Sequence, residues 1–332
     1  MERIKNLLRR WISRLCNKGG GVLLLSFWAL FFLSSISLTL SSMIRQKFIL
    51  INSLEDKDKL SLLGEGMGEK FIHKFINQRS DNPPISFKEF NKFMKELNEG
   101  EEGLFFIDLG KFVDEESKIN INKVDKTVLR QLFKNLGFSE QSAEAISASI
   151  VDWRDKDSEL SSPLEGAEDT YYRSLEYPYE AKDGDFEVLE ELLLLKDVDE
   201  EVFEKIKDFL TIYGEGRVNI NTASRIVLSS LGMSNRLIEK ILLYRAGEDG
   251  VEGTEDDNFF LTNSEIVPKL SQNYHLSDSE ISELNGIIDK YLTTTSHNFM
   301  LEYKIGLKNK KRTSAIVAVF NIQGKILYWR EI

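Results

Sequence analysis

Hydrophobic residues are concentrated in one run near the start of the chain. Positions 19–44 contain no charged residue, and the stretch from Val22 to Leu33 is almost entirely apolar. A helix of about 20 apolar residues is long enough to span a bilayer. The pattern therefore predicts one membrane-spanning helix. Six basic residues and one acidic residue precede the run, which places the N-terminal end in the cytoplasm and exports the rest of the chain.

The apolar pattern then changes from a continuous run to a helical repeat. Apolar residues recur at helical spacing over 45–80 with charged residues between them, which predicts that the helix continues in amphipathic form. The Asn-Pro-Pro sequence at 82–84 would end it. A short helix is predicted over 86–97, and strands are predicted over 104–109 and 119–121.

The middle of the chain contains an internal repeat, with copies near 119–155 and 218–248. Each copy begins with an apolar-Asn-Ile-Asn sequence and continues as a helix, a Leu-Gly pair, a second helix and an aromatic residue followed by arginine. Such a repeat predicts two similar helix–turn–helix units that pack together. Asn122 and Asn221 precede the first helices, and we expect them to act as N-caps.

The chain closes with three β-rich runs separated by turn sequences, which predicts antiparallel strands joined by hairpins. The predicted fold class is therefore α+β, in which a long N-terminal transmembrane helix continues into an α/β domain that carries a large inserted all-α domain. The expected divisions are a leader at 1–21, the transmembrane helix at 22–44, the α/β domain at 45–122, the insertion at 123–292 and the closing strands at 293–332.

The charge of the chain limits its partners. The 332 residues include 54 acidic and 43 basic side chains, which gives a formal charge of −11. Removing the basic segment before Val22 leaves a charge of −16, which argues against sequence-independent binding of nucleic acid. A single cysteine excludes an intramolecular disulfide and, with three histidines, leaves little for a Cys/His zinc site.

Much of the acidic excess lies in two glycine-containing loops of the insertion. Carboxylates without His or Cys suit a hard cation with oxygen ligands, calcium above all. Neither loop has EF-hand spacing, and the alternative is a solvated acidic loop. Like charges in one loop repel unless something neutralises them, which favours the ion. The candidate ligands are Asp152, Asp155, Asp157, Glu165, Glu168 and Asp169 in the first loop and Asp249, Glu252, Asp256 and Asp257 in the second.

Catalytic motifs are missing from the sequence. His73, His275 and His297 are far apart, and no HExxH, G-x-S-x-G or P-loop sequence occurs. The many carboxylates leave a glycosidase-type pair open, but nothing singles one out. We therefore predict that the protein is not an enzyme and name no catalytic residue. A soluble exported enzyme released by signal peptidase is the third hypothesis, and its mature chain would begin near residue 43.

The sequence before the apolar run resembles a type IV prepilin-like leader, in which a basic residue and glycine precede a hydrophobic helix. The resemblance implies cleavage by a prepilin peptidase after Gly21, with Val22 as the mature N-terminus. Most members of that class carry Glu at the fifth mature position, where this chain has Ser26. A Glu in lipid needs a partner such as a neighbouring amino terminus, so its absence suits a subunit at a filament tip. The alternative is an ordinary secretory signal cut around Ser41.

Over nearly its whole length the chain resembles the minor pseudopilin K family of type II secretion systems. The matching pieces are the Gly21-Val22 junction without the Glu, Lys118-Ile119-Asn120-Ile121-Asn122, Asp152-Trp153-Arg154-Asp155, Gly166-Ala167-Glu168-Asp169 with Tyr171-Tyr172, Glu190-Glu191-Leu192-Leu193, Gly216-Arg217-Val218-Asn219-Ile220-Asn221-Thr222-Ala223 and Trp329-Arg330-Glu331. Val124 and Asp125 depart from the pattern, because Thr and Ala are usual there.

The resemblance implies a structural, non-enzymatic protein with a pilin-like α/β domain and an inserted α-domain. It implies assembly with the minor pseudopilins I and J into a tip complex that initiates the pseudopilus for protein export across the outer membrane. It further implies a single inner-membrane span, a soluble domain in the periplasm, N-methylation after cleavage, and calcium bound in the α-domain. That calcium would fall on the two acidic loops.

The runner-up hypothesis comes from the repeat, which resembles the helix-hairpin-helix units of competence-type DNA receptors. Those units present main-chain N–H groups to phosphate from a glycine-rich hairpin. Both hairpins of this chain lack the second glycine and are flanked by acidic residues. Repulsion between these acids and phosphate opposes an exported DNA-binding protein, and we expect no nucleic acid as partner.

Overall fold

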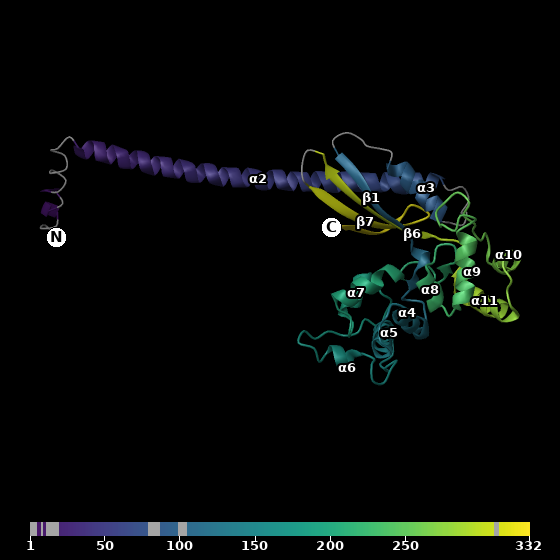
Figure 1. Ribbon diagram of the computed structural model, residues 1–332. Coiled ribbons are helices and arrows are strands. Elements are labelled where there is room, and N and C mark those ends of the chain that lie inside the picture. The colour runs from purple at the N-terminus through teal and green to yellow at the C-terminus, as the bar shows by residue number, and fades with distance from the viewer. Residues whose placement is uncertain (1–4, 8, 11–19, 79–86, 99–104, 309–311) are drawn as a thin grey trace. The chain divides into compact units, whose positions relative to one another are not determined.

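A computed structural model describes residues 5–7, 9, 10, 20–78, 87–98, 105–308 and 312–332 (Figure 1). The chain divides into two compact units, Met1–Leu62 and Leu63–Ile332. Helix α2, Gly20–Gln78, begins in the first unit and ends in the second, which confirms the predicted long helix. Its N-terminal part includes a segment long and apolar enough to cross a membrane, and none of that segment is buried. The predicted Asn-Pro-Pro stop lies outside the described residues.

An antiparallel sheet of four strands forms one layer of the second unit. Its strand order is β1 (Phe105–Asp114), β6 (Asn298–Leu307), β7 (Thr313–Asn321) and β8 (Ile326–Glu331). The three closing strands predicted from the sequence are therefore confirmed, and β1 extends the first predicted strand. The short helix α3, Phe87–Asn98, packs beside β1, as the predicted helix would.

The C-terminal part of α2 lies very close to the sheet. The Tyr303 hydroxyl donates to the main-chain carbonyl of Gly64 at 2.6 Å. A methyl group on Gly68 would lie 2.6 Å from that same hydroxyl and 2.9 Å from the Trp329 ring. One turn further on, the Phe71 ring meets the Tyr303 ring edge to face at 5.5 Å. Glycine at these helix positions therefore permits a contact that any larger residue would obstruct.

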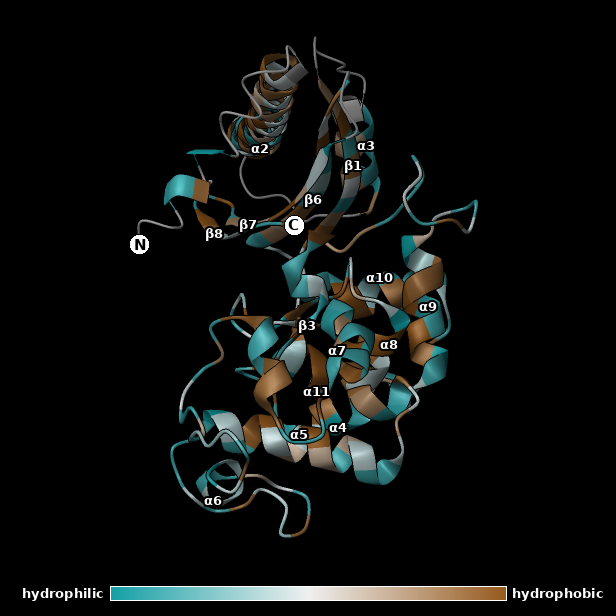
Figure 2. Cartoon of the chain, turned by 90° about the vertical axis from the view of Figure 1, so that its left-hand side faces the viewer, coloured by the Kyte–Doolittle hydropathy of each residue, from teal (hydrophilic) through white to brown (hydrophobic). Residues whose placement is uncertain are grey.

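The inserted helical domain runs from β2 to β5 and contains two structural copies. The first copy contains β2 (Ile119–Asn120), α4 (Lys126–Asn135), α5 (Glu140–Arg154), α6 (Asp169–Tyr172), η2 (Leu189–Leu194), α7 (Glu200–Ile206), η3 (Lys207–Phe209) and β3 (Leu210–Thr211). The second contains β4 (Val218–Asn219), α8 (Arg225–Ser230), α9 (Asn235–Arg245), η4 (Asn263–Glu265), α10 (Ile266–Asn273), α11 (Asp278–Tyr291) and β5 (Leu292–Thr293). Hydrophobic residues gather between the central helices, whereas the loops around α6 are largely hydrophilic (Figure 2).

Each copy closes on itself through a short parallel strand pair. Strand β2 pairs with β3, and β4 pairs with β5 in the same manner. Helices α4 and α8 pack against each other, as the sequence repeat predicts. The structural copies therefore continue past residues 155 and 248, where the recognisable sequence similarity ends, to Thr211 and Thr293.

Asn122 and Asn221 do not act as N-caps, which corrects the prediction. In each copy the N-cap lies three positions further along the chain. Asn122 instead accepts from the main-chain N–H of Phe186 at 2.8 Å and donates to its carbonyl at 3.0 Å. Asn221 makes the same two bonds to Phe260, also at 2.8 and 3.0 Å. These asparagine clamps hold a distant segment in place, a role that local spacing does not reveal.

Candidate metal centre

The two acidic loops occupy equivalent places in the two copies. The first acidic loop (155–185) joins α5 to the Phe held by Asn122, and the second acidic loop (246–259) joins α9 to the Phe held by Asn221. An arginine ends the helix before each loop and donates to main-chain carbonyls of its own copy, Arg154 to Val124 at 2.6 Å and Arg245 to Ala223 at 2.7 Å. The two loops therefore begin at equivalent arginines, each of which is held by hydrogen bonds to the main chain of its own copy.

In the first acidic loop, Asp155, Asp157 and Glu168 come together. Each offers a carboxylate oxygen, and these oxygens lie within 4.8 Å of one another. Glu168 is only 6% exposed. The Asp155 Oδ1 and Glu168 Oε1 atoms are both buried without a hydrogen-bond partner. Buried polar atoms in proteins are normally satisfied, so two unpartnered oxygens in a group of three carboxylates fit a bound cation.

The raised pKa values of the clustered carboxyl groups are also consistent with a cation site. Burial, reinforced by repulsion from neighbouring carboxylates, raises the pKa of Asp155 to about 6 and the pKa of Glu168 to about 7. Arg154 opposes the rise at Asp155. Within the described residues none of the three clustered acids forms a salt bridge. Arg154 offsets the negative charge of this group only in part, and a divalent ion would remove the remaining repulsion.

Asp183 was missed by sequence reasoning, although it faces the same cluster. Its charge contributes to the raised pKa of both Asp155 and Glu168. Its main chain has a positive φ of 53°, and its N–H donates to the carbonyl of Trp153 at 3.1 Å. It lies far along the loop from Asp155, Asp157 and Glu168, in a separate acidic stretch with Asp185 and Glu187, so sequence spacing does not connect it with the cluster.

Asp152 is fully buried and supports the loop. Its two carboxylate oxygens accept main-chain N–H groups of Ser161 and Ala167, each at 2.8 Å. A methyl group on Gly166 would lie 2.4 Å from Asp152 Oδ2, so glycine is needed for this approach. Asp152 therefore ties two distant parts of the loop together and positions Glu168, while its own oxygens are already occupied.

The remaining predicted residues of the first loop lie outside the cluster. Glu165 accepts from the Gln141 side chain at 2.9 Å. Asp169 accepts from the main-chain N–H of Ala181 at 2.9 Å and pairs with Arg173 at 2.9 Å. Both carboxylates therefore have partners that tie the loop to itself or to α5.

In the second acidic loop, main-chain N–H groups of the loop donate to the carboxylates of Asp249, Asp256 and Asp257. Asp256 accepts from the main-chain N–H groups of Glu248 and Asp249 at 2.6 and 2.9 Å, and from the Thr254 hydroxyl at 2.7 Å. These bonds, the hydroxyl first, lower the pKa of Asp256 to about 2. Asp257 accepts from the main-chain N–H of Gly253 at 2.7 Å. Asp249, Asp256 and Asp257 therefore belong to a tight hydrogen-bonded turn.

The fourth predicted ligand of this loop, Glu252, has a cation beside it. Buried Arg245 lies 2.7 Å from Glu252 Oε1. The loop also packs on α3, where Lys88 pairs with Glu255 at 2.9 Å and Asn91 donates to the carbonyl of Gly253 at 3.1 Å. An internal arginine thus supplies positive charge in the second copy, and the loop fastens the inserted domain to α3.

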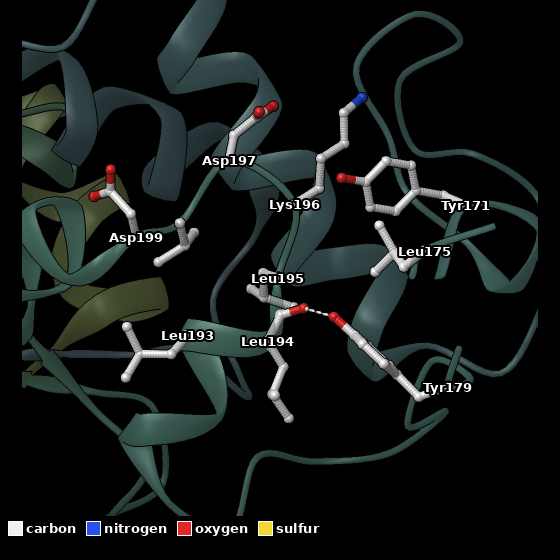
Figure 3. Close-up of a pocket in the computed structure, with 10 residues that line it drawn as sticks. Tyr171, Leu175, Tyr179, Leu193, Leu194, Leu195, Lys196, Asp197 and Asp199 are labelled. Carbon is white, nitrogen blue, oxygen red and sulfur yellow. Dashed lines mark hydrogen bonds between the residues drawn. The ribbon is translucent and has the colours of Figure 1, made fainter. Parts of the chain in front are cut away.

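A surface pocket of about 420 Å³ lies next to the first acidic loop (Figure 3). Tyr171, Leu175 and Tyr179 line one side, and the segment 193–199 lines the other. The Tyr179 hydroxyl donates to the carbonyl of Leu194 at 2.6 Å and bridges the two sides. Because one side belongs to the acidic loop, the order of that loop determines the shape of the pocket.

The turns between the paired helices of each copy are the places where a helix-hairpin-helix unit would contact nucleic acid. Gly137 and Gly232 stand at the turns with φ of 86° and 94°. At the second hairpin the main-chain N–H of Ser234 donates to the Glu283 carboxylate at 2.6 Å. In a DNA-binding hairpin such an N–H would face phosphate. The chain's own carboxylate takes that position, which argues against nucleic acid there.

The residues predicted for processing lie at the start of α2. Gly21 and Val22 are both helical, and Val22 is exposed. Ser26 donates through its hydroxyl to the carbonyl of Leu23 at 2.9 Å, within the same helix. The preceding basic residue and first glycine of the predicted leader lie outside the described residues.

Part of the chain is similar in sequence to known proteins. Residues 107–215 match the family model for protein K of the type II secretion system. A curated type II secretion system protein K from Pectobacterium carotovorum subsp. carotovorum is 30% identical over 109 residues, which is 33% of each chain. The match therefore spans about a third of the length of that relative.

A solved structure is similar over a much larger part of the chain. It is a chain from the crystal structure of the GspK-GspI-GspJ complex of enterotoxigenic Escherichia coli, with 16% identity and a TM-score of 0.61. The likeness covers 85% of this chain and 98% of that chain, and it extends to the fold of the sheet and of the inserted domain. Residues 107–215 of this protein are therefore similar in sequence to protein K of the type II secretion system, and the chain shares the fold of the solved structure.

Proposed function

We propose that this protein is a minor pseudopilin at the tip of a type II secretion pseudopilus. The observation that carries the proposal is the protein K sequence within residues 107–215, in a chain whose fold is similar to that of a GspK-complex chain over 85% of its length. Its role is structural, and it helps to initiate pseudopilus assembly for protein export across the outer membrane. No catalytic group is required for this role.

The N-terminal part of α2 would anchor the protein in the inner membrane. Its apolar segment is long enough to cross a bilayer, and the basic residues before it favour a cytoplasmic N-terminus. Prepilin peptidase would cut between Gly21 and Val22, leaving the soluble domain in the periplasm. Ser26 in place of a membrane-buried acid fits a subunit that has no neighbour above it.

The partners would be the minor pseudopilins I and J, because the similar solved chain comes from a complex with GspI and GspJ. The inserted helical domain would occupy the end of the filament and prevent another subunit from stacking on it. This explains why a tip subunit gains from an insertion that a repeating subunit could not accommodate.

The first acidic loop would bind one calcium ion through Asp155, Asp157 and Glu168. Two unpartnered buried oxygens and the lack of a salt bridge to these three acids within the described part of the chain support this assignment. The ion would hold the loop in one conformation. The second acidic loop, whose Glu252 pairs with Arg245 of α9, would not need an ion.

The function is tested by expressing the full chain together with minor pseudopilins I and J of the same secretion system. We expect the three proteins to purify as one complex from detergent-solubilised inner membranes, and mass spectrometry to find a mature N-terminus at Val22. Failure to co-purify would overturn the tip assignment. A mature N-terminus in the serine-rich stretch near Ser41 would overturn the membrane anchor.

A further inference from the structure

The chain passes between the sheet and the inserted helical domain at two places. The outgoing crossing (114–118) leaves the end of β1 through the 3-10 helix η1, Glu115–Ser117. The returning crossing (294–298) leads from β5 into β6. The two crossings lie side by side, because Asp114 pairs with Phe299 in the sheet. The inserted domain can move relative to the sheet only if the main chain bends at these two short segments.

The Asp114 carboxylate joins the two crossings to the second copy. Its Oδ2 accepts from Asn219 Nδ2 at 3.0 Å, from the Ser296 hydroxyl at 2.6 Å and from the Thr222 hydroxyl. Its Oδ1 accepts from the main-chain N–H of Glu116 at 2.9 Å. Four donors compensate in part for the loss of water around this buried group, but burial still raises the pKa of Asp114 above its ordinary value.

The Glu116 carboxylate has a poorer environment. It is 5% exposed, and the donors to its oxygens come from the returning crossing, from Asn298 Nδ2 at 2.7 Å and from Asn298 N at 3.1 Å. Its Oε1 lies close to Gly214, where a methyl group would be 3.0 Å away. A protonated Glu116 could donate to Asn298 after rotation of that amide, which exchanges its oxygen and nitrogen positions.

The charges at this joint do not balance when every acid is ionised. Three consecutive buried acids occur at 114–116, and Lys118 pairs with Glu115 at 2.6 Å. Among the described residues neither Asp114 nor Glu116 forms a salt bridge. The titratable or charged neighbours are Asp114, Glu115, Lys118 and Tyr213, with the main chain of His297 adjacent. Two anions therefore face each other without a second cation, which a single bound proton would relieve.

We propose that Glu116 binds a proton that locks the two crossings together, and that release of this proton loosens the joint between the sheet and the inserted helical domain. Ionised Glu116 repels Asp114 within the outgoing crossing and requires water, which reaches the site only if the two crossings separate. Burial and the nearby Asp114 charge raise the pKa of Glu116 to about 8. The joint is therefore closed in neutral or acidic surroundings and loosens in alkaline ones.

The proposal is tested by measuring a distance between the sheet and the inserted domain. Spin labels are attached to full-length protein in detergent micelles with excess calcium, after the substitutions Cys16→Ser, Gln323→Cys and Ser271→Cys. We expect a narrow distance distribution at about pH 6 and a broader or shifted one at about pH 9.5, on either side of the raised pKa. An unchanged distribution in the otherwise unaltered chain would overturn the proposal without need of a further variant.

Two variants separate Glu116 from general effects of pH. Glu116→Gln retains the shape without the charge, so its distribution should stay narrow at both pH values. Asp208→Asn removes an exposed acid that pairs with Lys111 at 3.7 Å, also between the inserted domain and the sheet. The distance distribution of this control variant should broaden at high pH, as it does in the otherwise unaltered chain. If Glu116→Gln broadens equally, another group carries the proton and the assignment to Glu116 is wrong.

Discussion

Glu168 is the deepest acid of the first acidic loop, and one of its oxygens lacks a partner. We predict that Glu168→Gln abolishes the stabilisation that calcium gives the protein. A ligand at a hundred times its Kd stabilises the native state by about 2.7 kcal/mol, so the loss is measurable as a smaller rise in Tm on adding calcium to chelated protein. Glu159→Gln, which neutralises an exposed acid of the same loop, should retain the full rise. An equal rise in both variants would contradict the assigned ligands.

Two glycines of α2 that lie two positions apart should respond in opposite ways to alanine. A methyl group on Gly68 would meet the rigid rings of Tyr303 and Trp329, whereas nothing lies within 4 Å of one on Gly66. We predict that Gly68→Ala destabilises the protein by about 1–3 kcal/mol through overpacking. Gly66→Ala should stabilise it by about 0.5–1 kcal/mol, because alanine favours the helix. Urea unfolding of both variants measures the difference, and destabilisation by Gly66→Ala would contradict the packing described.

At the scale of elements, the asparagine clamps replace the sheet contacts that the short strands of the inserted domain cannot provide. Asn221 is buried and satisfies both the N–H and the carbonyl of Phe260. We predict that Asn221→Ala costs about 3 kcal/mol, because two main-chain groups lose their partners. Asn273→Ala, at an exposed helix end, should change stability by less than about 0.5 kcal/mol. Equal effects of the two substitutions on denaturant midpoints would count against the clamp.

Local periodicity predicted the elements well, and it failed where a side chain acts at long range. The long helix, the closing strands and the paired hairpins follow from spacing within short windows. Asn122 and Asn221 were expected to be caps because both stand just before helices, yet their partners lie 64 and 39 residues away. One signal was available, since both copies place a glutamate five residues after the clamped phenylalanine, Glu191 and Glu265.

The sequence predicted which loops are acidic, but it did not predict which of their carboxylates come together. Counting acids identified both loops, yet the second loop bonds its carboxylates to its own N–H groups and to Arg245. Which carboxylates remain unpartnered depends on the course of the main chain, which residue counts do not encode. Asp183 shows the same limit, because only folding brings it near Glu168.

At the scale of the whole molecule, the buried joint should make stability depend on pH. The folded-state pKa of Glu116 lies near 8, above its ordinary value of 4.5, so the native state holds a proton that the unfolded chain has released. Its stabilising contribution is complete below about pH 4.5 and is lost as the pH rises to about 8. In excess calcium, we predict that the free energy of unfolding falls across this range and that Glu116→Gln flattens the fall. A profile unchanged by the variant would contradict the raised pKa.

The position of the inserted helical domain within the sheet has a further consequence. Strands β1 and β6 are antiparallel neighbours, and the domain joins the end of one to the start of the other. In topological terms the whole domain is therefore an enlarged hairpin loop. Replacing it with a two-residue β-turn would leave every strand of the sheet with its present neighbours. An architecture of this kind lets the inserted domain and the sheet vary independently, since a change of loop leaves the strand order intact.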